Sequence, residues 1–111
     1  MFETINSFEE FLTLKEKEPA LLAYFSTEAC NVCKVLKPKV GELIDNEFPK
    51  IKTVYVQTDQ LPEVAAKNRI FAVNTILIYF DGREYIRKSR NIGIAELQQE
   101  IDRPYSMFFA E

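Results

Sequence analysis

The sequence contains no histidine and no tryptophan, and only two of its 111 residues are cysteine. Without histidine, the protein has neither Ser-His nor Cys-His nucleophilic catalysis, and it has no histidine-ligated metal site. Any general acid–base chemistry would have to use carboxylates, lysines or the thiols themselves. These exclusions leave the two cysteines as the residues that say most about function.

Long apolar runs and clusters of one charge are also missing. No apolar stretch approaches the roughly 20 residues that a transmembrane helix needs. Met1 to Thr4 lack the basic start and the apolar core of a signal peptide. The net charge is −3, with acidic and basic residues interspersed, so no basic face indicates nucleic acid or anionic lipid. We therefore expect a cytoplasmic protein with no nucleic-acid partner and no membrane partner.

The length and the 47% hydrophobic content are typical of one globular domain, which we expect to span residues 1–111. Ser7 and Glu10 predict a capping box at the first helix, and Asp81-Gly82 predicts a hairpin. The pattern predicts strands at 2–5, 20–26, 51–57, 75–80 and 84–89, and helices from Ser7 to about Lys17, at about 31–46, at 61–68, and from 92 or 94 to 102. This order predicts an α/β fold, in which helices cover both faces of a mixed sheet.

Two segments carry apolar residues whose packing the pattern also predicts. The helix at 31–46 has apolar residues at three- and four-residue spacing, which predicts one buried face made of Val32, Val35, Leu36, Val40, Leu43 and Ile44. The tail from Arg103 to Phe109 is rich in aromatic residues. We expect this tail to dock on the domain's own sheet, with a dimer or partner contact as the alternative.

The two cysteines form the motif Cys30-Asn31-Val32-Cys33, between the strand predicted at 20–26 and the helix predicted at 31–46. At such a junction, the helix dipole and free backbone N–H groups favour a thiolate, and Cys30 lies nearer to them. In a reducing compartment, an isolated pair of this kind indicates redox or metal chemistry before a structural disulfide. Two buried, inert thiols are the remaining alternative.

Several residues together resemble the thioredoxin family. They are the Cys30/Cys33 pair, Lys34 directly after it, Pro38 five residues beyond the second cysteine, the stretch Thr58-Asp59-Gln60-Leu61-Pro62, and Thr75 to Tyr79 followed by Asp81-Gly82. The resemblance covers nearly the whole chain and implies a thioredoxin fold. It also implies a thiol–disulfide oxidoreductase, in which Cys30 attacks a substrate disulfide and Cys33 resolves the mixed disulfide.

The same resemblance implies which partners the protein uses. No organic cofactor is implied, because the electrons pass through the dithiol itself. The substrates would be protein or small-molecule disulfides, and a reductase or a low-molecular-weight thiol would recycle the dithiol. The substrate groove is expected to be bordered by Asn31, Val32, Val73, Asn74 and Thr75. We expect a monomer or a weak dimer.

Several positions depart from the family's pattern. Asn74 stands in the place of the family's cis-proline. Because a cis bond before a non-proline residue costs about 3–4 kcal/mol, we predict that Val73–Asn74 is trans or that the loop is rearranged. Tyr24 and Tyr55 stand where the family has a buried aspartate and a lysine that assist proton transfer. Arg90 aligns with a glycine of the family's partner-binding surface. These departures predict an oxidoreductase of restricted specificity.

Four side chains near the dithiol are given an expected role. Tyr24 and Tyr55 are expected to be core aromatics whose hydroxyls bond to each other or to a water. Lys34 either lowers the pKa of Cys30 or is a solvated residue of the helix surface. In one alternative, the Asn74 amide hydrogen-bonds to a thiolate or to a substrate backbone. In the other, Asn74 is a turn residue, tolerated because asparagine accepts unusual backbone angles.

Two other functions stay open at this stage. A thiolate metal site would need further ligands from carboxylates or from a second subunit, because a closed zinc site has about four ligands. We therefore name no metal ligand in this sequence. The other alternative is a thioredoxin-fold binding or adaptor module whose redox chemistry has decayed.

Overall fold

The computed structural model describes residues 2–110. Its helices and strands follow in the order β1 (Glu3–Thr4), α1 (Phe8–Lys17), β2 (Ala20–Ser26), α2 (Asn31–Glu47), β3 (Lys52–Gln57), α3 (Pro62–Lys67), β4 (Thr75–Phe80), β5 (Arg83–Ser89) and α4 (Ile94–Phe108). The order and the types of all these elements agree with the sequence prediction. The largest difference is the end of α4, which lies six residues beyond the predicted position.

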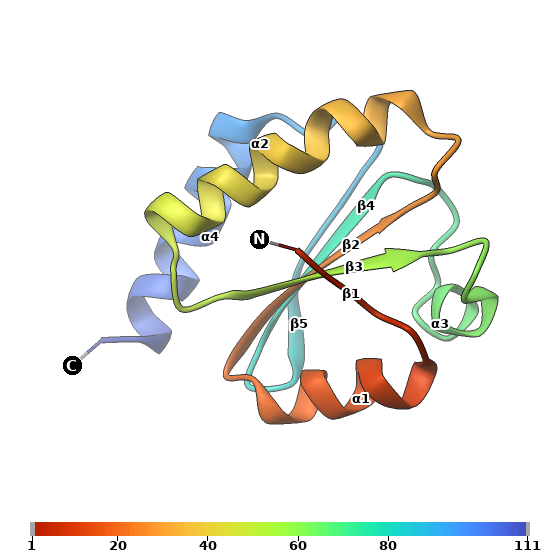
Figure 1. Ribbon diagram of the computed structural model, residues 1–111. Helices are drawn as coiled ribbons and strands as arrows, with labels where there is room; N and C mark the ends of the chain where they lie inside the picture. Colours follow the sequence, from red (N-terminus) through yellow and green to blue (C-terminus); the bar gives the residue numbers. More distant parts are fainter. Residues whose placement is uncertain (1, 111) are drawn as a thin grey trace.

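A five-stranded mixed sheet forms the centre of the structure, with the strand order β1-β3-β2-β4-β5 (Figure 1). Strands β1, β3 and β2 run parallel to one another, whereas β4 is antiparallel to β2 and β5 is antiparallel to β4. The predicted α/β architecture with a mixed sheet is confirmed. Strand β2 lies at the middle of this order, so the end of β2 is an interior position of the sheet.

Helices cover both faces of the sheet, with α2 and α4 on one face and α1 and α3 on the other (Figure 1). Successive side chains of a strand point to opposite faces. In β2, Leu22 and Tyr24 join the cluster beneath α2 and α4, whereas Leu21 and Phe25 join the cluster beneath α1 and α3. All seven residues of β2 are buried, as its apolar sequence predicts for an interior strand.

Helix α1 begins where the capping box was predicted. The Ser7 hydroxyl accepts a hydrogen bond from the Glu10 backbone N–H at 3.0 Å. The Glu10 carboxylate accepts from the N–H of Asn6 at 2.7 Å, one residue before the N-cap. Two backbone donors that the helix leaves unpaired are thereby satisfied. The helix then buries Phe11, whose ring lies between those of Phe25 and Tyr79.

The predicted buried face of α2 is only partly correct. Val40, Leu43 and Ile44 are buried and Leu36 packs against the same cluster, but Val32 is 67% exposed and Val35 is 61% exposed. The reason lies in helix geometry, because 32 and 35 continue along the helix to Lys39 and Glu42, which are polar. The apolar stripe that faces the sheet instead starts at Cys33. Val32 and Val35 therefore lie on a separate, solvent-facing stripe.

Helix α4 continues through Pro104 to Phe108, whereas the sequence predicted an end at Asp102. The aromatic residues of this last turn explain the difference, because they pack on the body of the protein. The Tyr105 ring lies 5.0 Å from Phe48 and the Phe108 ring 5.6 Å from Phe80, measured between centroids. The prediction that this segment docks on the domain's own sheet is confirmed for Phe108, because Phe80 lies in β4, whereas Tyr105 packs on the end of α2.

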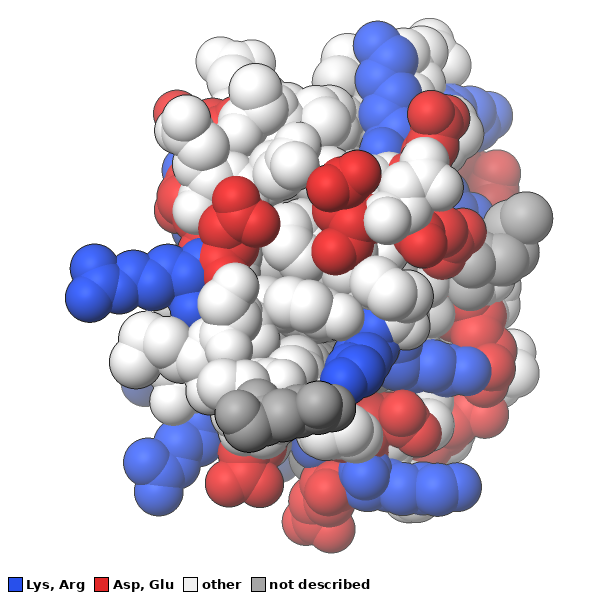
Figure 2. Space-filling model, turned by 90° about the vertical axis from the view of Figure 1, so that its left-hand side faces the viewer, with Lys and Arg blue, Asp and Glu red and all other residues white. Residues whose placement is uncertain are grey.

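The surface follows the charge pattern of the sequence on the face that carries α4. Figure 2 shows Lys and Arg interspersed with Asp and Glu on this face. Ion pairs of this kind include Lys88, whose ammonium lies 2.8 Å from both Glu96 and Glu100. Within residues 2–110, no helix has the length and apolar character needed to cross a bilayer.

Candidate active site

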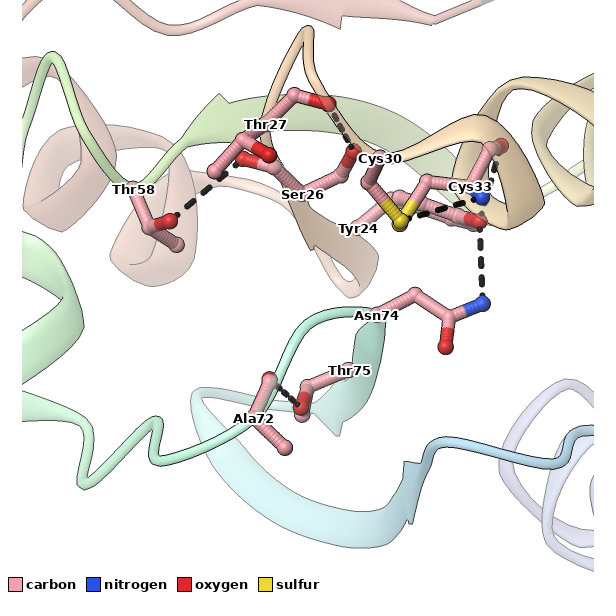
Figure 3. The surroundings of a disulfide bond; sticks show 9 residues. All are labelled: Tyr24, Ser26, Thr27, Cys30, Cys33, Thr58, Ala72, Asn74 and Thr75. Atoms are coloured by element: carbon pink, nitrogen blue, oxygen red, sulfur yellow. Dashed lines mark hydrogen bonds between the residues drawn. A yellow bond between two sulfur atoms is a disulfide. The ribbon is translucent and has the colours of Figure 1, made fainter.

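Cys30 and Cys33 lie at the junction between β2 and α2, as predicted, and are joined by a disulfide with a Cα–Cα distance of 5.3 Å (Figure 3). Cys30 is the N-cap of α2, and its Sγ accepts a hydrogen bond from the Cys33 backbone N–H at 3.2 Å. A sulfur in this position faces the positive end of the helix dipole. The reduced Cys30 would therefore be stabilised as a thiolate.

The two sulfur-bearing residues differ in exposure. Cys33 is 1% exposed and belongs to the core cluster beneath α2, whereas Cys30 is only half-buried. An incoming partner can therefore reach the Cys30 side of the bond, while Cys33 stays behind it. Such an arrangement suits an exchange reaction, which needs one accessible sulfur and one neighbour that completes the transfer.

A chain of two hydrogen bonds joins Cys33 to the loop before β4 (Figure 3). The Tyr24 hydroxyl donates to the Cys33 carbonyl oxygen at 3.1 Å and accepts from Asn74 Nδ2 at 3.4 Å. Tyr24 and Tyr55 are core aromatics, as expected, but the Tyr24 hydroxyl bonds to Cys33 and Asn74 and not to Tyr55. The ring centroids of the two tyrosines are 6.5 Å apart, and the Tyr55 ring instead carries the Lys37 ammonium 3.7 Å above its centroid.

Of the two predicted alternatives, a trans bond or a rearranged loop, the trans bond is wrong, because the Val73–Asn74 peptide bond is cis. That prediction considered only the local preference of a peptide bond. In the fold, the Asn74 side chain is buried and bonded to Tyr24, and the Asn74 carbonyl accepts from the Arg90 backbone N–H at 2.9 Å. Asn74 is therefore held by contacts to two distant segments, which a local preference does not take into account. In this oxidised state, the Asn74 amide donates its hydrogen bond to Tyr24 and not to a sulfur.

The residues predicted to border the groove divide into two groups. Asn31, Val32 and Val73 are exposed, whereas Asn74 and Thr75 are buried. The Thr75 hydroxyl donates to the Ala72 carbonyl oxygen, which closes the loop on itself (Figure 3). A partner that approaches the disulfide would therefore meet the first group directly, and the second group supports the surface from below.

A recess of about 650 Å³ lies beside the dithiol, lined by Asn31 and Val32 from the motif, Val35, Leu36 and Lys39 further along α2, and residues 90–93. Neither Val35 nor Ile92 was predicted to lie there. Val35 had been assigned to the buried face. The signal that could have corrected this was the polar continuation of its stripe to Lys39. Residues 90–93 follow β5, and their position beside the start of α2 depends on where the β4–β5 hairpin leads the chain.

Two charged residues, Glu28 and Lys34, lie near the motif in the sequence. The Glu28 carboxylate accepts a hydrogen bond from Gln57 Nε2 at 2.9 Å. Lys34 is exposed on α2, next to Cys33, and its effect on the Cys30 thiol stays a prediction. Over the part of the chain that the structure describes, no group of three or more Cys, Asp or Glu side chains is placed to hold a metal ion.

The buried tyrosines predict a loss of stability at high pH. Burial raises the pKa of Tyr24 above its ordinary value near 10, with the Asn74 hydrogen bond opposing and Tyr55 adding to the shift. Burial also raises the pKa of Tyr79, and Glu84 adds to the shift. Since unfolding returns each pKa to about 10, the stabilisation is complete below pH ~10 and is lost as the pH rises further, at up to about 1.4 kcal/mol per pH unit for each group.

Urea unfolding between about pH 8 and about pH 11 measures this effect. We expect the free energy of unfolding of the unsubstituted protein to fall more steeply above pH ~10 than that of a Tyr24→Phe/Tyr79→Phe variant. Lysines that titrate in the same range contribute equally to both proteins. Equal slopes would contradict the account of these two hydroxyls.

Comparison with known proteins gives a consistent result. The family model described as Thioredoxin matches residues 2–103. The chain is 32% identical over 88 residues to the thioredoxin-like protein YdfQ of Bacillus subtilis (strain 168), which covers 79% of this chain and 78% of YdfQ. It is 30% identical over 100 residues to the chloroplastic thioredoxin Y1 of Arabidopsis thaliana, which covers 90% of this chain but only 57% of that protein.

Solved structures show the same fold. A Plasmodium falciparum thioredoxin superposes with a TM-score of 0.82 at 23% identity, covering 91% of this chain and 97% of that one. A Fasciola hepatica thioredoxin superposes with a TM-score of 0.80 at 27% identity, covering 92% of this chain and 98% of that one. The fold implied by the resemblance of the sequence is therefore confirmed.

Proposed function

This chain belongs to the thioredoxin family, and from that premise we propose that it exchanges disulfides with a narrow set of partner proteins through Cys30 and Cys33. Membership of the family, together with a disulfide between these two cysteines, makes the chain a thiol–disulfide oxidoreductase. The proposal adds the roles of the two sulfurs and the restriction in partners. The observation that carries the two roles is the unequal exposure of the two cysteines; the restriction is proposed because Asn74 and Arg90 stand at positions of the partner surface where the family has other residues.

The proposed reaction starts from the reduced protein. The Cys30 thiolate attacks one sulfur of a partner's disulfide, so that a bond forms between Cys30 and that sulfur while the partner's S–S bond breaks. The departing sulfur leaves as a thiolate and takes up a proton. Cys33 then attacks the Cys30 sulfur, which forms the disulfide present in this structure and releases the second partner thiol. In total, two electrons and two protons pass to the partner.

Proton transfer from Cys33 needs an acceptor, and the buried tyrosine beside it is unsuited to that task. The Tyr24 hydroxyl is bonded to the Cys33 carbonyl oxygen, and burial raises the Tyr24 pKa. The hydroxyl therefore stays protonated near neutral pH and cannot act as a base. The departing partner thiolate or a water would have to take the Cys33 proton. This favours partners whose leaving sulfur stays close to Cys33 after the first step.

The Cys30–Cys33 disulfide has to be reduced again after each reaction. A reductase or a low-molecular-weight thiol would return the Cys30–Cys33 disulfide to the dithiol, in a reducing, cytoplasmic compartment. We propose a monomer or a weak dimer as the working form. No cofactor takes part in any step.

A panel of disulfide-containing proteins tests the proposed restriction. The reduced protein is mixed with each substrate, and the rate of disulfide loss is compared with the rate for hydroxyethyl disulfide, a small neutral reference. We expect rates across the panel to differ by about 100-fold or more, since about 2.7 kcal/mol of contact energy is enough for that factor. Rates within a few-fold of one another would contradict restricted specificity. A Cys30→Ser/Cys33→Ser variant gives the background.

A further inference from the structure

A second recess, of about 710 Å³, carries an unusual concentration of positive charge. It is lined by residues of the α3–β4 segment and of β5, and four of them are cationic: Lys67, Arg69, Arg87 and Arg90. The one acidic residue in its lining is Glu84. The protein as a whole has a net charge of −3, so the balance of charge in this recess is opposite to that of the chain.

The Glu84 carboxylate does not neutralise the other cations of the recess, because it is already bonded to Arg87. The Arg87 Nε and Nη2 atoms each donate to the Glu84 carboxylate at 2.9 Å. Arg87 is also held from the other side, since it donates to the backbone carbonyls of Asn68 and Arg69 at 2.9 and 3.2 Å. Arg87 and Glu84 are thus a structural pair, and the charges left over are those of the other three cations.

Arg69 and Arg90 are the two guanidinium groups available to a ligand. Neither side chain makes a hydrogen bond or an ion pair within residues 2–110, and both are exposed. Lys67 is less free, since its ammonium lies 5.8 Å over the Phe8 ring. An arginine without a partner offers donors in a planar fork, which suits a carboxylate.

Arg90 connects this recess with the dithiol. It lines both the basic recess and the recess that contains Asn31 and Val32. Its backbone N–H donates to the Asn74 carbonyl at 2.9 Å, and Asn74 in turn bonds to Tyr24 beneath Cys33. Arg90 also has a φ of 66°, in the left-handed region that favours glycine. The Arg90 backbone is therefore tied to the loop that packs beneath Cys33, while its guanidinium is exposed.

Apolar groups lie beside these cations. Phe71, which lines the basic recess, is 89% exposed, and Val32 and Val73 are also exposed near the disulfide. An extended polypeptide could cover these side chains while it presents a cystine to Cys30. The surface therefore combines apolar contact for a peptide with a charged position beside it.

We propose that Arg90, together with Arg69, selects partner proteins in which acidic residues lie within a few positions of the reacting cysteine. The inference rests on the proposed function and names the substrate class of the same site. In the complex, the segment around the cystine lies against Val32 in the recess beside the dithiol. A neighbouring Asp or Glu carboxylate reaches the basic recess and binds the two free guanidinium groups.

Two synthetic peptides test this selection. Both contain the same intramolecular disulfide, which is flanked by Asp and Glu in one peptide and by Asn and Gln in the other. We expect the reduced protein to attack the acidic peptide about 10-fold faster at low salt, and the ratio to fall as the salt rises from about 0.05 M to about 0.5 M. Equal rates for the two peptides would overturn the inference while leaving the proposed function intact.

Three variants test whether Arg90 causes the faster reaction of the acidic peptide. Arg90→Gln and Arg90→Gly should both lower the ratio of the two rates clearly below that of the unsubstituted protein, with Arg69 accounting for what remains. The glycine variant also suits the positive φ, so that a loss of folding cannot account for the result. Arg83→Gln is the matched control, because Arg83 is an exposed arginine at the opposite end of β5 and should leave the ratio unchanged. A ratio that persists in both Arg90 variants would refute the role of Arg90.

Failure of the proposed function gives a different result in the same assay. If neither peptide is reduced, the dithiol does not perform the exchange, and the inference about Arg90 falls with it. If both are reduced at equal rates, the exchange stands and only the charge selection is wrong. The ratio and the absolute rate therefore separate the two failures.

Discussion

Replacement of Cys30 by serine is expected to abolish disulfide exchange, with a loss of about 1,000-fold or more in turnover. A hydroxyl in this position stays protonated near neutral pH and cannot attack a disulfide, whereas a thiolate at the N-cap of α2 can. Cys33 cannot replace it, because Cys33 is buried in the core beneath α2. The measurement is the rate of reduction of a protein disulfide under single-turnover conditions.

Replacement of Cys33 by serine is expected to have a different outcome in the same assay. The exposed Cys30 still attacks the partner, but no second thiol can release it, so the protein accumulates as a mixed disulfide. Non-reducing electrophoresis and intact mass measure this adduct. The opposite pattern, with adducts formed by Cys30→Ser and none by Cys33→Ser, would contradict the assignment of the two roles. If neither variant forms an adduct, the exchange mechanism is contradicted.

Replacement of Phe11 by alanine is expected to destabilise the protein by about 3–5 kcal/mol, a large part of the total stability of a domain of this size. Phe11 is fully buried, and its ring centroid lies 6.2 Å from those of Phe25 and of Tyr79. Because it is the buried residue of α1, its loss leaves a cavity between this helix and the sheet. Denaturant unfolding measures the change.

The neighbouring residue of the same helix provides the control. Leu12 is also apolar but exposed, so Leu12→Ala should change the free energy of unfolding by less than about 1 kcal/mol. Equal effects of the two substitutions would show that α1 is not anchored to the sheet through Phe11. Phe11 packs on the face of the sheet that α1 and α3 cover, whereas Cys33 belongs to the cluster on the other face, so both variants should retain the exchange reaction when folded.

The sequence predicts the architecture because each element carries a local signal. The unbroken apolar run of β2 and the capping residues Ser7 and Glu10 are signals that span only a few positions, and the structure confirms them. The end of α4 could not be predicted in this way. Pro104 argues locally for an end of the helix, but the packing of Tyr105 on Phe48 depends on residues 57 positions apart.

The site, like the fold, was predictable where it depends on residues that are close together in the chain. The place of Cys30 and Cys33 follows from one junction in the chain, and the structure confirms it. The hydrogen bond between Asn74 and Tyr24 joins residues 50 positions apart, and no local pattern predicts it. The prediction of a trans bond at Val73–Asn74 was wrong because it considered one peptide bond without these contacts.

Alkylation of the reduced protein tests most directly whether Cys30 is the reactive sulfur. The protein is treated with iodoacetamide over a range of pH, and peptide mapping measures the rate at each cysteine. The account requires Cys30 to react first, with a pH midpoint below the ordinary thiol pKa of about 8.5, while the buried Cys33 reacts slowly. Faster reaction of Cys33, or a midpoint for Cys30 at or above about 8.5, would contradict it.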